Sequence, residues 1–453
     1  MATVYIGGAA GFAGDRSDAG VPLAAALAKC DGPRFLMYEM LAERTLALCQ
    51  IERRKNPQHG YSPALERMLT PVLAPCLAAG IKIVGNFGAA NPQAAARKLA
   101  AMAGAQKLRP PRIAVVEGDD LSGVLTREEL AACETGGALL KTAREIVSAN
   151  VYLGARPIAD ALDQGADIVV TGRVADSALA LGTLLHAFEW RAADWDKLAA
   201  GTMAGHLLEC GAQVTGGYFA DPGCKDVPDL AHVGYPIAEV GDGGGIVMTK
   251  PDGTGGVVNR LTVIEQLLYE IHDPSAYLAP DVVLDLMNVE VAEIGNDRVR
   301  VTGARGKPAP DTLKATVCVD GGLLGEAEIS YAGPGAAARA QLAADVIRRR
   351  VGEKAPNLRI RVDAIGAASI LGATDAPPAL RDDGPQDVRL RFAAQSSDRA
   401  EIDVMLDEVE ALYCAGPAGG AGVRRRVTPR LASTSCLIER RYTRPRVTML
   451  EPS

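Results

Sequence analysis

Aromatic residues are scarce in this 453-residue chain, at 4% of the sequence, which disfavours an aromatic-rich recognition surface. The nine cysteines are scattered and form no C-x-x-C pair, so we expect neither a disulfide framework nor a cysteine zinc site. No apolar run approaches the roughly 18–20 residues of a membrane span, and the first residues lack the basic and apolar regions of a signal peptide. We therefore expect a cytoplasmic protein without a membrane partner.

Several chemical motifs are also missing. The sequence contains no H-E-x-x-H pattern, no Cys/His zinc spacing and no G-x-S-x-G nucleophile elbow. The net charge of −7 and the lack of a basic block disfavour a nucleic-acid partner. Oxygen ligands at Glu117, Asp119 or Asp120 are compatible with a metal ion, but no motif supports one. We expect no metal and no cofactor.

The first half of the chain has the pattern of a parallel sheet flanked by helices. Short apolar runs alternate with Ala-rich amphipathic stretches, which is typical of an α/β fold. The predicted strands are Val4–Ile6, Arg34–Tyr38, Ile81–Val84, Arg112–Val116 and Asp167–Val170. The predicted helices are Pro22–Ala28, Leu41–Arg53, Ala64–Ala79, Pro92–Ala103, Ile158–Gln164, Asp176–Phe188 and Leu198–Cys210. Because the chain is too long for one ordinary core, we assign residues 1–240 to this α/β domain and expect a second one.

The pattern changes after about residue 240, where longer alternating stretches predict an α+β domain with a mostly antiparallel sheet. The predicted strand regions are Asp281–Ala304, Thr312–Tyr331, Leu358–Ile365 and Asp387–Ala394, with helices at Ala336–Val351 and Arg399–Leu412. The segment Ala415–Arg430 is rich in Gly, Pro and Arg, and we predict a loop there. This second domain spans residues 241–453.

Polar residues follow three of the predicted parallel strands. They are Asn86 and Asn91 after the strand at 81–84, Glu117, Asp119 and Asp120 after 112–116, and Arg173, Asp176 and Ser177 after 167–170. The carboxyl ends of parallel strands share one edge of the sheet, beside helix N-termini that attract anions. We therefore predict that the three loops meet around one ligand site.

Each of these residues also has a plain structural explanation. Asn91 and Asp176 stand where helix N-caps are expected, and a solvated turn would suit Asp119 and Asp120. The two interpretations are balanced for any single residue. The convergence of the whole set favours a functional site.

A glycine-rich segment, Gly7–Gly14, follows the first strand, and Glu39 follows the second. This order resembles a dinucleotide fingerprint, in which glycines approach a pyrophosphate and an acid binds the ribose. The spacing is not G-x-G-x-x-G, however, and an ordinary strand-to-helix turn explains it equally well. The segment supports an alternative function as an NAD(P)-dependent oxidoreductase.

Two further segments are weaker candidates. His206 and Cys210 lie four residues apart on a predicted helix, as a base and nucleophile would, although a buried structural Cys is the commoner situation. We keep His206 as a candidate general acid or base. Near the glycine-rich segment at 241–256, Lys250, Thr254 and Gly255 have the composition of an anion-binding loop or lid. A hairpin at 241–245 followed by a helix start is the structural alternative.

The chain resembles the acyclic terpene utilisation AtuA family at these and neighbouring segments. The resembling pieces are Gly11–Asp15, Asn86–Pro92, Val116–Asp120, Asn150–Ala155, Thr171–Ala178, Ala204–Gly217, Gly234–Glu239 and Lys250–Gly256. They occur in order between about residues 3 and 445. The chain departs from the family at Ala13, where the first loop usually carries Trp, and it stops before the C-terminal ferredoxin-like domain of many relatives. The resemblance thus implies either a small ferredoxin-like partner chain or an independent protein.

The resemblance implies a role in the breakdown of branched acyclic terpenes and other organic acids, commonly as coenzyme A thioesters. The leading hypothesis is a cofactor-independent lyase, a hydratase or dehydratase acting on a branched carboxylate or acyl-CoA thioester. The roles we assign are general acid or base for Glu117, Asp119 or Asp176, anion anchor for Arg173 with Lys250, and enolate stabiliser for Asn86 or Asn150. The alternatives are the oxidoreductase and a non-catalytic subunit of an acyl-CoA-processing complex. We also expect a homo-oligomer, as is common for metabolic enzymes.

Overall fold

The computed structural model describes residues 3–135, 137–367 and 386–451. The chain divides into two compact units. The first comprises residues up to Thr142, Ile146–Cys318 and the segment from Ser433, and the second comprises Ala143–Glu145 and Val319–Ala432. Residue 240, where the sequence pattern changes, lies within a strand of the first unit.

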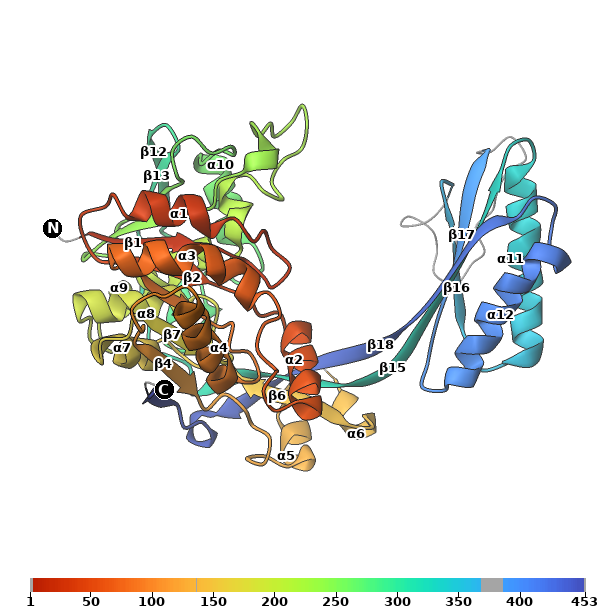
Figure 1. Ribbon diagram of the computed structural model, residues 1–453, viewed down its shortest axis with the longest axis horizontal. Helices are drawn as coiled ribbons and strands as arrows, with labels where there is room; N and C mark the ends of the chain where they lie inside the picture. The colour runs from red at the N-terminus through yellow and green to blue at the C-terminus, as the bar shows by residue number, and fades with distance from the viewer. Residues whose placement is uncertain (1–2, 136, 368–385, 452–453) are drawn as a thin grey trace. The chain divides into compact units, whose positions relative to one another are not determined.

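The first unit is built on a ten-stranded sheet whose centre is parallel (Figure 1). The parallel strands are β1 (Thr3–Gly8), β2 (Arg34–Tyr38), β3 (Lys82–Gly85), β7 (Ile168–Thr171) and β4 (Ile113–Glu117), in that spatial order. Their apolar runs are buried on both sides, as central parallel strands require. This confirms the predicted α/β class.

Antiparallel strands extend this sheet at both sides. Beyond β1 lie β8 (Ile237–Gly241), β9 (Ile246–Thr249), β13 (Arg298–Thr302) and β12 (Glu290–Gly295), and beyond β4 lies β19 (Arg446–Met449). The glycine-rich segment at 241–245 forms the tight turn between β8 and β9. This is the hairpin that we gave as the structural alternative to an anion-binding loop. Segments from the later part of the sequence therefore complete the sheet that carries the N-terminal strands.

Helices cover both faces of the sheet. The chain passes through β1, β2, β3 and β4 in one direction and then returns to β7, so right-handed crossovers place the later helices on the opposite face. One layer contains α1 (Gly20–Leu27), α3 (Leu65–Ala79) and α4 (Pro92–Ala105), and the other contains α7 (Arg156–Asp163), α8 (Ala178–Phe188) and α9 (Trp195–Glu209). Among the described residues, every helix is too short or too polar to cross a lipid bilayer.

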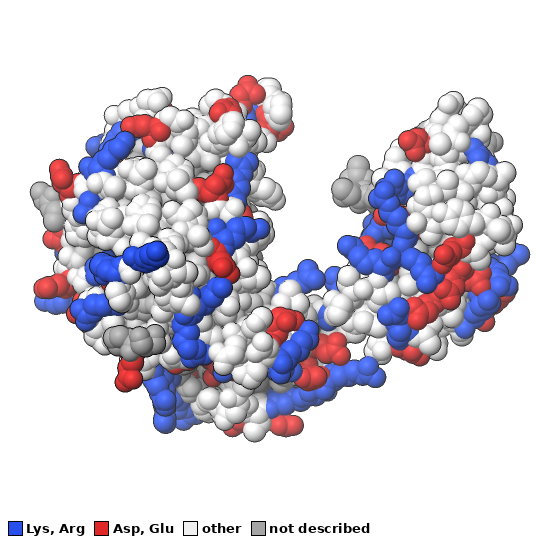
Figure 2. Space-filling model, in the orientation of Figure 1, with Lys and Arg blue, Asp and Glu red and all other residues white. Residues whose placement is uncertain are grey.

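The second unit has the element order β-α-β-β-α-β. Its elements are β15 (Thr312–Ala332) from Val319 onward, α11 (Ala336–Lys354), β16 (Ile360–Ile365), β17 (Asp387–Ser396), α12 (Arg399–Ala415) and β18 (Ala421–Glu439) as far as Ala432. The strand order is β16-β17-β15-β18, and β17 is antiparallel to both of its neighbours. This is a ferredoxin-like arrangement within the chain itself, and it confirms the predicted α+β pattern. Figure 2 shows acidic and basic side chains interspersed over this unit.

The loop predicted at Ala415–Arg430 was wrong from residue 421 onward, where β18 begins. Val423 and Val427 pack against the helix-covered core, while Arg426 pairs with Glu326 of β15. The alternation of strand residues is therefore present, but its outward positions carry arginines. Together with the neighbouring Gly and Pro, these arginines gave the segment the composition of a loop.

Two loops at the carboxyl edge of the parallel strands approach each other closely at Gly88. A Cβ atom at this position would lie 2.5 Å from the carbonyl oxygen of Thr171 and 2.8 Å from Cα of Pro92. Both contacted atoms belong to the backbone and cannot move aside as a flexible side chain would. Gly88→Ala is therefore expected to lower the free energy of unfolding by about 2–3 kcal/mol. Gly104→Ala in α4, which meets no atom within 4 Å, is the matched control and should stabilise slightly or not at all. Tryptophan fluorescence during urea unfolding measures this, because Trp190 and Trp195 both lie in the first unit.

Candidate functional site

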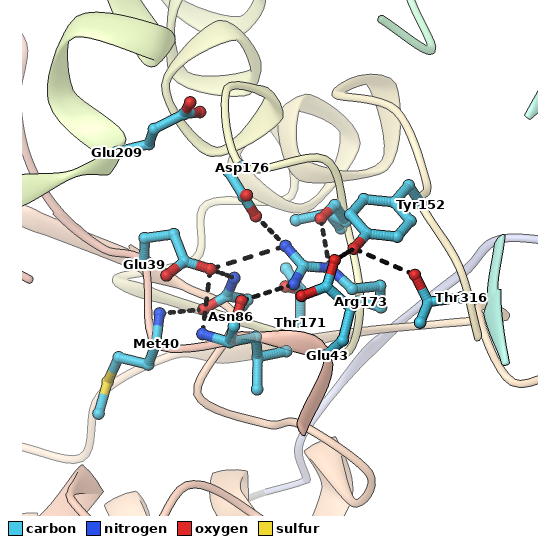
Figure 3. Close-up of polar contacts among 12 residues, drawn as sticks. Glu39, Met40, Glu43, Asn86, Tyr152, Thr171, Arg173, Asp176, Glu209 and Thr316 are labelled. Atoms are coloured by element: carbon cyan, nitrogen blue, oxygen red, sulfur yellow. Dashed lines mark hydrogen bonds and ion pairs between the residues drawn. The ribbon is translucent and has the colours of Figure 1, made fainter. Parts of the chain in front are cut away.

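Three loops that are distant in sequence meet at the carboxyl edge of the parallel strands (Figure 3). Glu39 directly follows β2, Asn86 directly follows β3, and Arg173 lies two residues after β7. The Asn86 amide donates to Glu39 Oε1 over 2.8 Å, and Arg173 Nη2 lies 3.6 Å from the same oxygen. Two of the three predicted loops, those that carry Asn86 and Arg173, thus lie together, and the loop after β2 joins them through Glu39.

Asn86 fixes the direction of the Glu39 carboxylate. Its side chain is fully buried, and its Oδ1 accepts from the backbone N–H of Met40 over 2.7 Å. Glu39 Oε1 also accepts from the N–H of Leu41 over 3.0 Å. Asn86 therefore clamps the turn after β2 and positions Glu39 instead of facing an open pocket.

Among the residues that the structure describes, Arg173 is the largest fully buried side chain, at 2% exposed, and it directs its donors to protein acceptors. Nε donates to the carbonyl of Val174 and Nη1 to that of Leu41, each over 2.8 Å. Nη2 pairs with Asp176 and approaches Glu39. The guanidinium carbon lies 4.5 Å from the centroid of the Tyr152 ring. These contacts favour a role in holding Glu39 and Asp176 together over that of a free anion anchor.

A second branch of the network leads from Tyr152 to a cavity. The Tyr152 hydroxyl donates to Glu43 Oε1 over 3.0 Å and accepts from Thr316 Oγ1 over 3.4 Å. Glu43 begins α2 (Glu43–Lys55), and Thr316 lies in β15. Together with Thr135, Ser433, Thr434 and Ser435 they line a cavity of about 300 Å³. That volume is at the lower limit for small-molecule sites, and the lining is polar.

The electrostatic environment raises the pKa of Glu39 well above its ordinary value. Burial is the largest cause, because it disfavours the charged carboxylate. Arg173, Asn86 and the N–H of Leu41 oppose this shift only in part, and the charge of Glu209 adds to it. A buried carboxyl that exchanges a proton closer to neutral pH is suited to acid–base chemistry.

Asp119, in the loop after β4, is hydrogen-bonded to Asn150 and to the loop after β7 that carries Arg173. Its Oδ2 accepts from the Asn150 amide and from the backbone N–H of Arg173, each over 2.8 Å. Burial raises the pKa of Asp119 to about 6, against the opposition of these two hydrogen bonds. Asp119 and Asn150 are thus connected to the candidate site through the backbone of Arg173.

His206 lies on α9 and pairs with Glu209, not with Cys210. Its Nδ1 lies 2.7 Å from Glu209 Oε1. Burial is the largest single influence and lowers the pKa of His206, but the Glu209 carboxylate and hydrogen bonds to the backbone of Gln266 and Leu267 together outweigh it, so the net shift is upward. Burial raises the pKa of the Cys210 thiol to about 12, so the thiol stays protonated at neutral pH. Cys210 therefore resembles a buried structural cysteine and not a nucleophile.

The sequence matches the model of the acyclic terpene utilisation family protein AtuA over residues 4–449. The chain belongs to this family. The match includes both units and all the residues of the network described above. No curated protein matches the chain.

Other residues predicted for the site of this AtuA family member have structural contacts. Asn91 caps α4 by accepting from the N–H of Ala94, and its amide donates to two backbone carbonyls. Glu117 is partly buried at the end of β4, where it accepts from Gln93 over 3.1 Å. Ser177 is buried at the start of α8, beside Asp176. Asn91 thus acts as a helix cap, as the structural explanation predicts, whereas Ser177 lies next to Asp176 in the Glu39–Arg173–Asp176 network.

The segment around Lys250 forms a local network of its own. Lys250 Nζ lies 3.2 Å from Asp297 and donates to the carbonyl of Thr254 over 2.9 Å. The Gly255 N–H donates to the carbonyl of His232. The charge of Lys250 and this backbone N–H thus already have protein partners.

The glycine-rich loop after β1 also directs N–H groups to protein oxygens. Gly8 donates to the carbonyl of Pro236 over 2.9 Å, and Gly11 donates to Asp15 Oδ2 over 2.8 Å. Glu39, the expected ribose ligand of a dinucleotide site, is instead bound to Asn86 and approached by Arg173. These contacts give the oxidoreductase alternative no support.

Sequence reasoning missed several members of the network. Glu39 was considered only as a dinucleotide ligand, although it follows a parallel strand as Asn86 does. Tyr152 and Glu209 lie within the segments that carry the family resemblance, but their partners are far away in the sequence. Glu43 and Thr316 carry no local signal, because long-range packing alone brings them together. Within the described residues, no three His, Cys, Asp or Glu side chains are placed to hold one metal ion.

The raised pKa of Asp119 predicts a specific dependence of stability on pH. A folded-state pKa of about 6, above the ordinary 3.8, stabilises the protein at low pH, and this contribution is lost as the pH rises through about 6. In Asp119→Asn the amide oxygen can still accept from both N–H groups, but nothing ionises. Between about pH 4 and pH 7 the wild type should lose on the order of 3 kcal/mol relative to this variant.

Urea unfolding followed by tryptophan fluorescence at both pH values measures that difference. Asp120→Asn is the control, since Asp120 is 40% exposed and its carboxylate accepts from Ser122 N–H in a turn. Parallel stability–pH curves for the wild type and Asp119→Asn would contradict the raised pKa.

Proposed function

We propose that this AtuA family member is a hydro-lyase, which adds water to or removes it from a branched carboxylate or its coenzyme A thioester. The observation that supports this is the Glu39–Arg173–Asp176 cluster at the carboxyl edge of the sheet, in which Glu39 and Arg173 are buried and Asp176 is partly exposed. Ligands of open α/β sheets bind at this edge. Family membership gives the metabolic setting, the use of acyclic terpenes.

Removal of water from a β-hydroxy acyl group needs a base for the proton next to the carbonyl and an acid for the departing hydroxyl. The oxidation state of the substrate does not change overall, so the reaction requires no redox cofactor. We assign the α-proton to the Glu39–Asp176 pair, whose carboxylates share Nη2 of Arg173. Glu39 has the raised pKa that suits a base, and Asp176, at 36% side-chain exposure, is the member that a ligand reaches more easily.

The polar cavity beside Glu43 and Thr316 is the proposed location of the hydrophilic end of the substrate. Its lining offers hydroxyl groups, and Lys314 Nζ lies 3.7 Å from Glu43. The cavity connects to Arg173 through Tyr152, whose ring contacts the guanidinium group. A substrate bound there would have its carbonyl end near the cluster.

A substrate panel in ¹⁸O-labelled water tests the proposal. Full-length protein is incubated with branched α,β-unsaturated acids and their coenzyme A thioesters, and mass spectrometry detects incorporated label. We expect at least one thioester or acid to gain labelled water, and the rate to fall at least 100-fold in Asp176→Asn. Glu52→Gln, at an exposed position of α2, is the control and should keep the wild-type rate. Absence of label in the entire panel would contradict a hydro-lyase and favour a non-catalytic subunit.

A further inference from the structure

The polar cavity of about 300 Å³ has a lining that restricts what it can bind. The lining belongs to the first unit and comes from α2, β15, β18 and β5 (Glu134–Thr135). The lining residues are Glu43, Thr135, Thr316, Ser433, Thr434 and Ser435. In the part of the chain that the structure describes, five hydroxyl groups and one carboxylate therefore surround this space, and no cationic side chain does.

Tyr152 connects this cavity to the Arg173 cluster. Its hydroxyl donates to Glu43 Oε1 over 3.0 Å, and its ring centroid lies 4.5 Å from the guanidinium carbon of Arg173. Because the Tyr152 proton is directed to Glu43, Thr316 must be the donor in its contact of 3.4 Å with Tyr152. Figure 3 shows Glu43, Tyr152 and Thr316 beside Arg173. A ligand that extends from the cavity to the cluster therefore passes along one tyrosine side chain.

Two further hydroxyl groups of the lining also direct their proton to protein acceptors. Thr135 Oγ1 donates to the carbonyl of Ser435 over 3.0 Å. Thr434 Oγ1 donates to Glu134 Oε1 over 2.9 Å. A hydroxyl group has one proton and two lone pairs, so these two groups, like that of Thr316, can only accept a hydrogen bond from a ligand.

Glu43 gives the lining a negative charge. Burial raises the pKa of Glu43, but its own backbone N–H, the Lys314 ammonium group and the Tyr152 hydroxyl, among other groups, lower it by more, so the net shift is downward. Glu43 is therefore an ionised acceptor at neutral pH. Lys314 Nζ lies 3.7 Å from Glu43 Oε1 but is not among the groups that line the cavity. A ligand carboxylate in the cavity would thus face the charge of Glu43 without a cation in the lining to receive it.

The lining as a whole favours an uncharged ligand group that donates a hydrogen bond. A secondary amide has this character, because its N–H can face the carboxylate and threonine oxygens while its carbonyl accepts from a hydroxyl of Ser433 or Ser435. A free carboxylate has acceptors only. The arm of coenzyme A that carries an acyl group presents such an amide, separated from the thioester sulfur by two methylene groups.

We infer that this cavity binds the first amide of the coenzyme A arm, so that the substrate of the site is a thioester and not the free acid. The inference rests on the proposed function, which includes both forms of the substrate, and it selects one of them. In this arrangement the thioester carbonyl lies toward Glu39 and Asp176, and the amide N–H lies toward Glu43. Glu43 and Thr316 are then binding residues that take no part in proton transfer.

Three thioesters of 3-methylbutyrate that differ at the amide position test the inference. Their thiols are N-acetylcysteamine, its ester analogue in which oxygen replaces the N–H, and 3-mercaptopropionate, which ends in a carboxylate. The saturated acyl chain can neither gain nor lose water, so ligand-observed NMR measures binding to the full-length protein without turnover. We expect the amide probe to bind about 10-fold more tightly than either of the others. The ester lacks the proton that Glu43 accepts, and the carboxylate faces a like charge.

Glu43→Gln separates the charge of the cavity from its shape. The Gln oxygen can still accept from Tyr152, but the negative charge is absent. This variant should bind the carboxylate probe roughly threefold more tightly than the wild type does, and should prefer the amide over the ester by less. Glu52→Gln, the same substitution at an exposed position of α2, is the matched control and should leave all three affinities unchanged.

The outcomes separate this inference from the proposed function. Equal affinity of the wild type for the amide and ester probes, or tighter binding of the carboxylate probe, would overturn the inference. If no probe binds, the inference is also overturned, and ¹⁸O label in a free acid would show that the proposed function survives it. Selective binding of the amide probe without label in any acid or thioester would support the thioester site and contradict the proposed reaction.

Discussion

Glu39→Gln is expected to reduce kcat/KM about 1000-fold at neutral pH while leaving the fold intact. The amide oxygen of Gln can still accept from the N–H of Leu41 and from Asn86, so the turn after β2 keeps its hydrogen bonds. What the variant lacks is a carboxylate that can take a proton. The loss should appear in kcat as well as in kcat/KM, because the interaction that is removed is one with the transition state.

The pH profile separates this role from a structural one. A base must be deprotonated, so the wild-type rate should rise with pH through the raised pKa of Glu39, above the range of an ordinary Glu. The residual activity of Glu39→Gln should not show this rise with pH. The raised pKa also means that ionised Glu39 destabilises the folded state, so the variant should be at least as stable as the wild type above neutral pH. An active variant, within about threefold of wild type, would show that the base lies elsewhere.

The sequence predicted the parallel core and the polar residues that gather at one edge of its sheet, because both depend on local patterns. The strands β2, β3 and β7 are short apolar runs followed by polar residues: Asn86 comes directly after β3, and Arg173 comes two residues after β7. The antiparallel strands that extend the sheet were not assigned to it. Their partners are set by contacts between distant segments, such as β1 with β8 and β4 with β19.

The chemistry of the site was harder to predict than its location, because each side chain takes its role from its neighbours. Arg173 has the sequence features of an anion anchor, but in the fold it is enclosed by the carbonyls of Leu41 and Val174 and by Asp176. Tyr152 gains its position from contacts with Arg173 and with Thr316, which lies 164 residues later. A linear pattern of residue types contains no information about such enclosure.

This enclosure changes what is expected of substitutions at Arg173. Considered only as an anion anchor, Arg173 could be removed without unfolding the protein. The structure predicts instead that Arg173→Met lowers the free energy of unfolding of the first unit by about 3–5 kcal/mol. The variant keeps apolar volume but leaves Glu39 and Asp176 without their common cation and two buried carbonyls without a donor. Urea unfolding followed by the fluorescence of Trp190 and Trp195 reports on this unit.

Two comparisons show whether the loss comes from the buried charges. Arg109→Met breaks an Arg–Asp pair with a guanidinium that is 52% exposed, and should cost only about 0–1 kcal/mol. In the background of Glu39→Gln, Arg173→Met should cost less than in the wild type, because one of the uncompensated carboxylates is gone. The cost of Arg173→Met should also be smaller at acidic pH, where the buried Glu39 carboxyl is protonated and needs no cation. A cost that is the same in both backgrounds and at every pH would mean that lost packing, and not the uncompensated carboxylate, determines the role of Arg173.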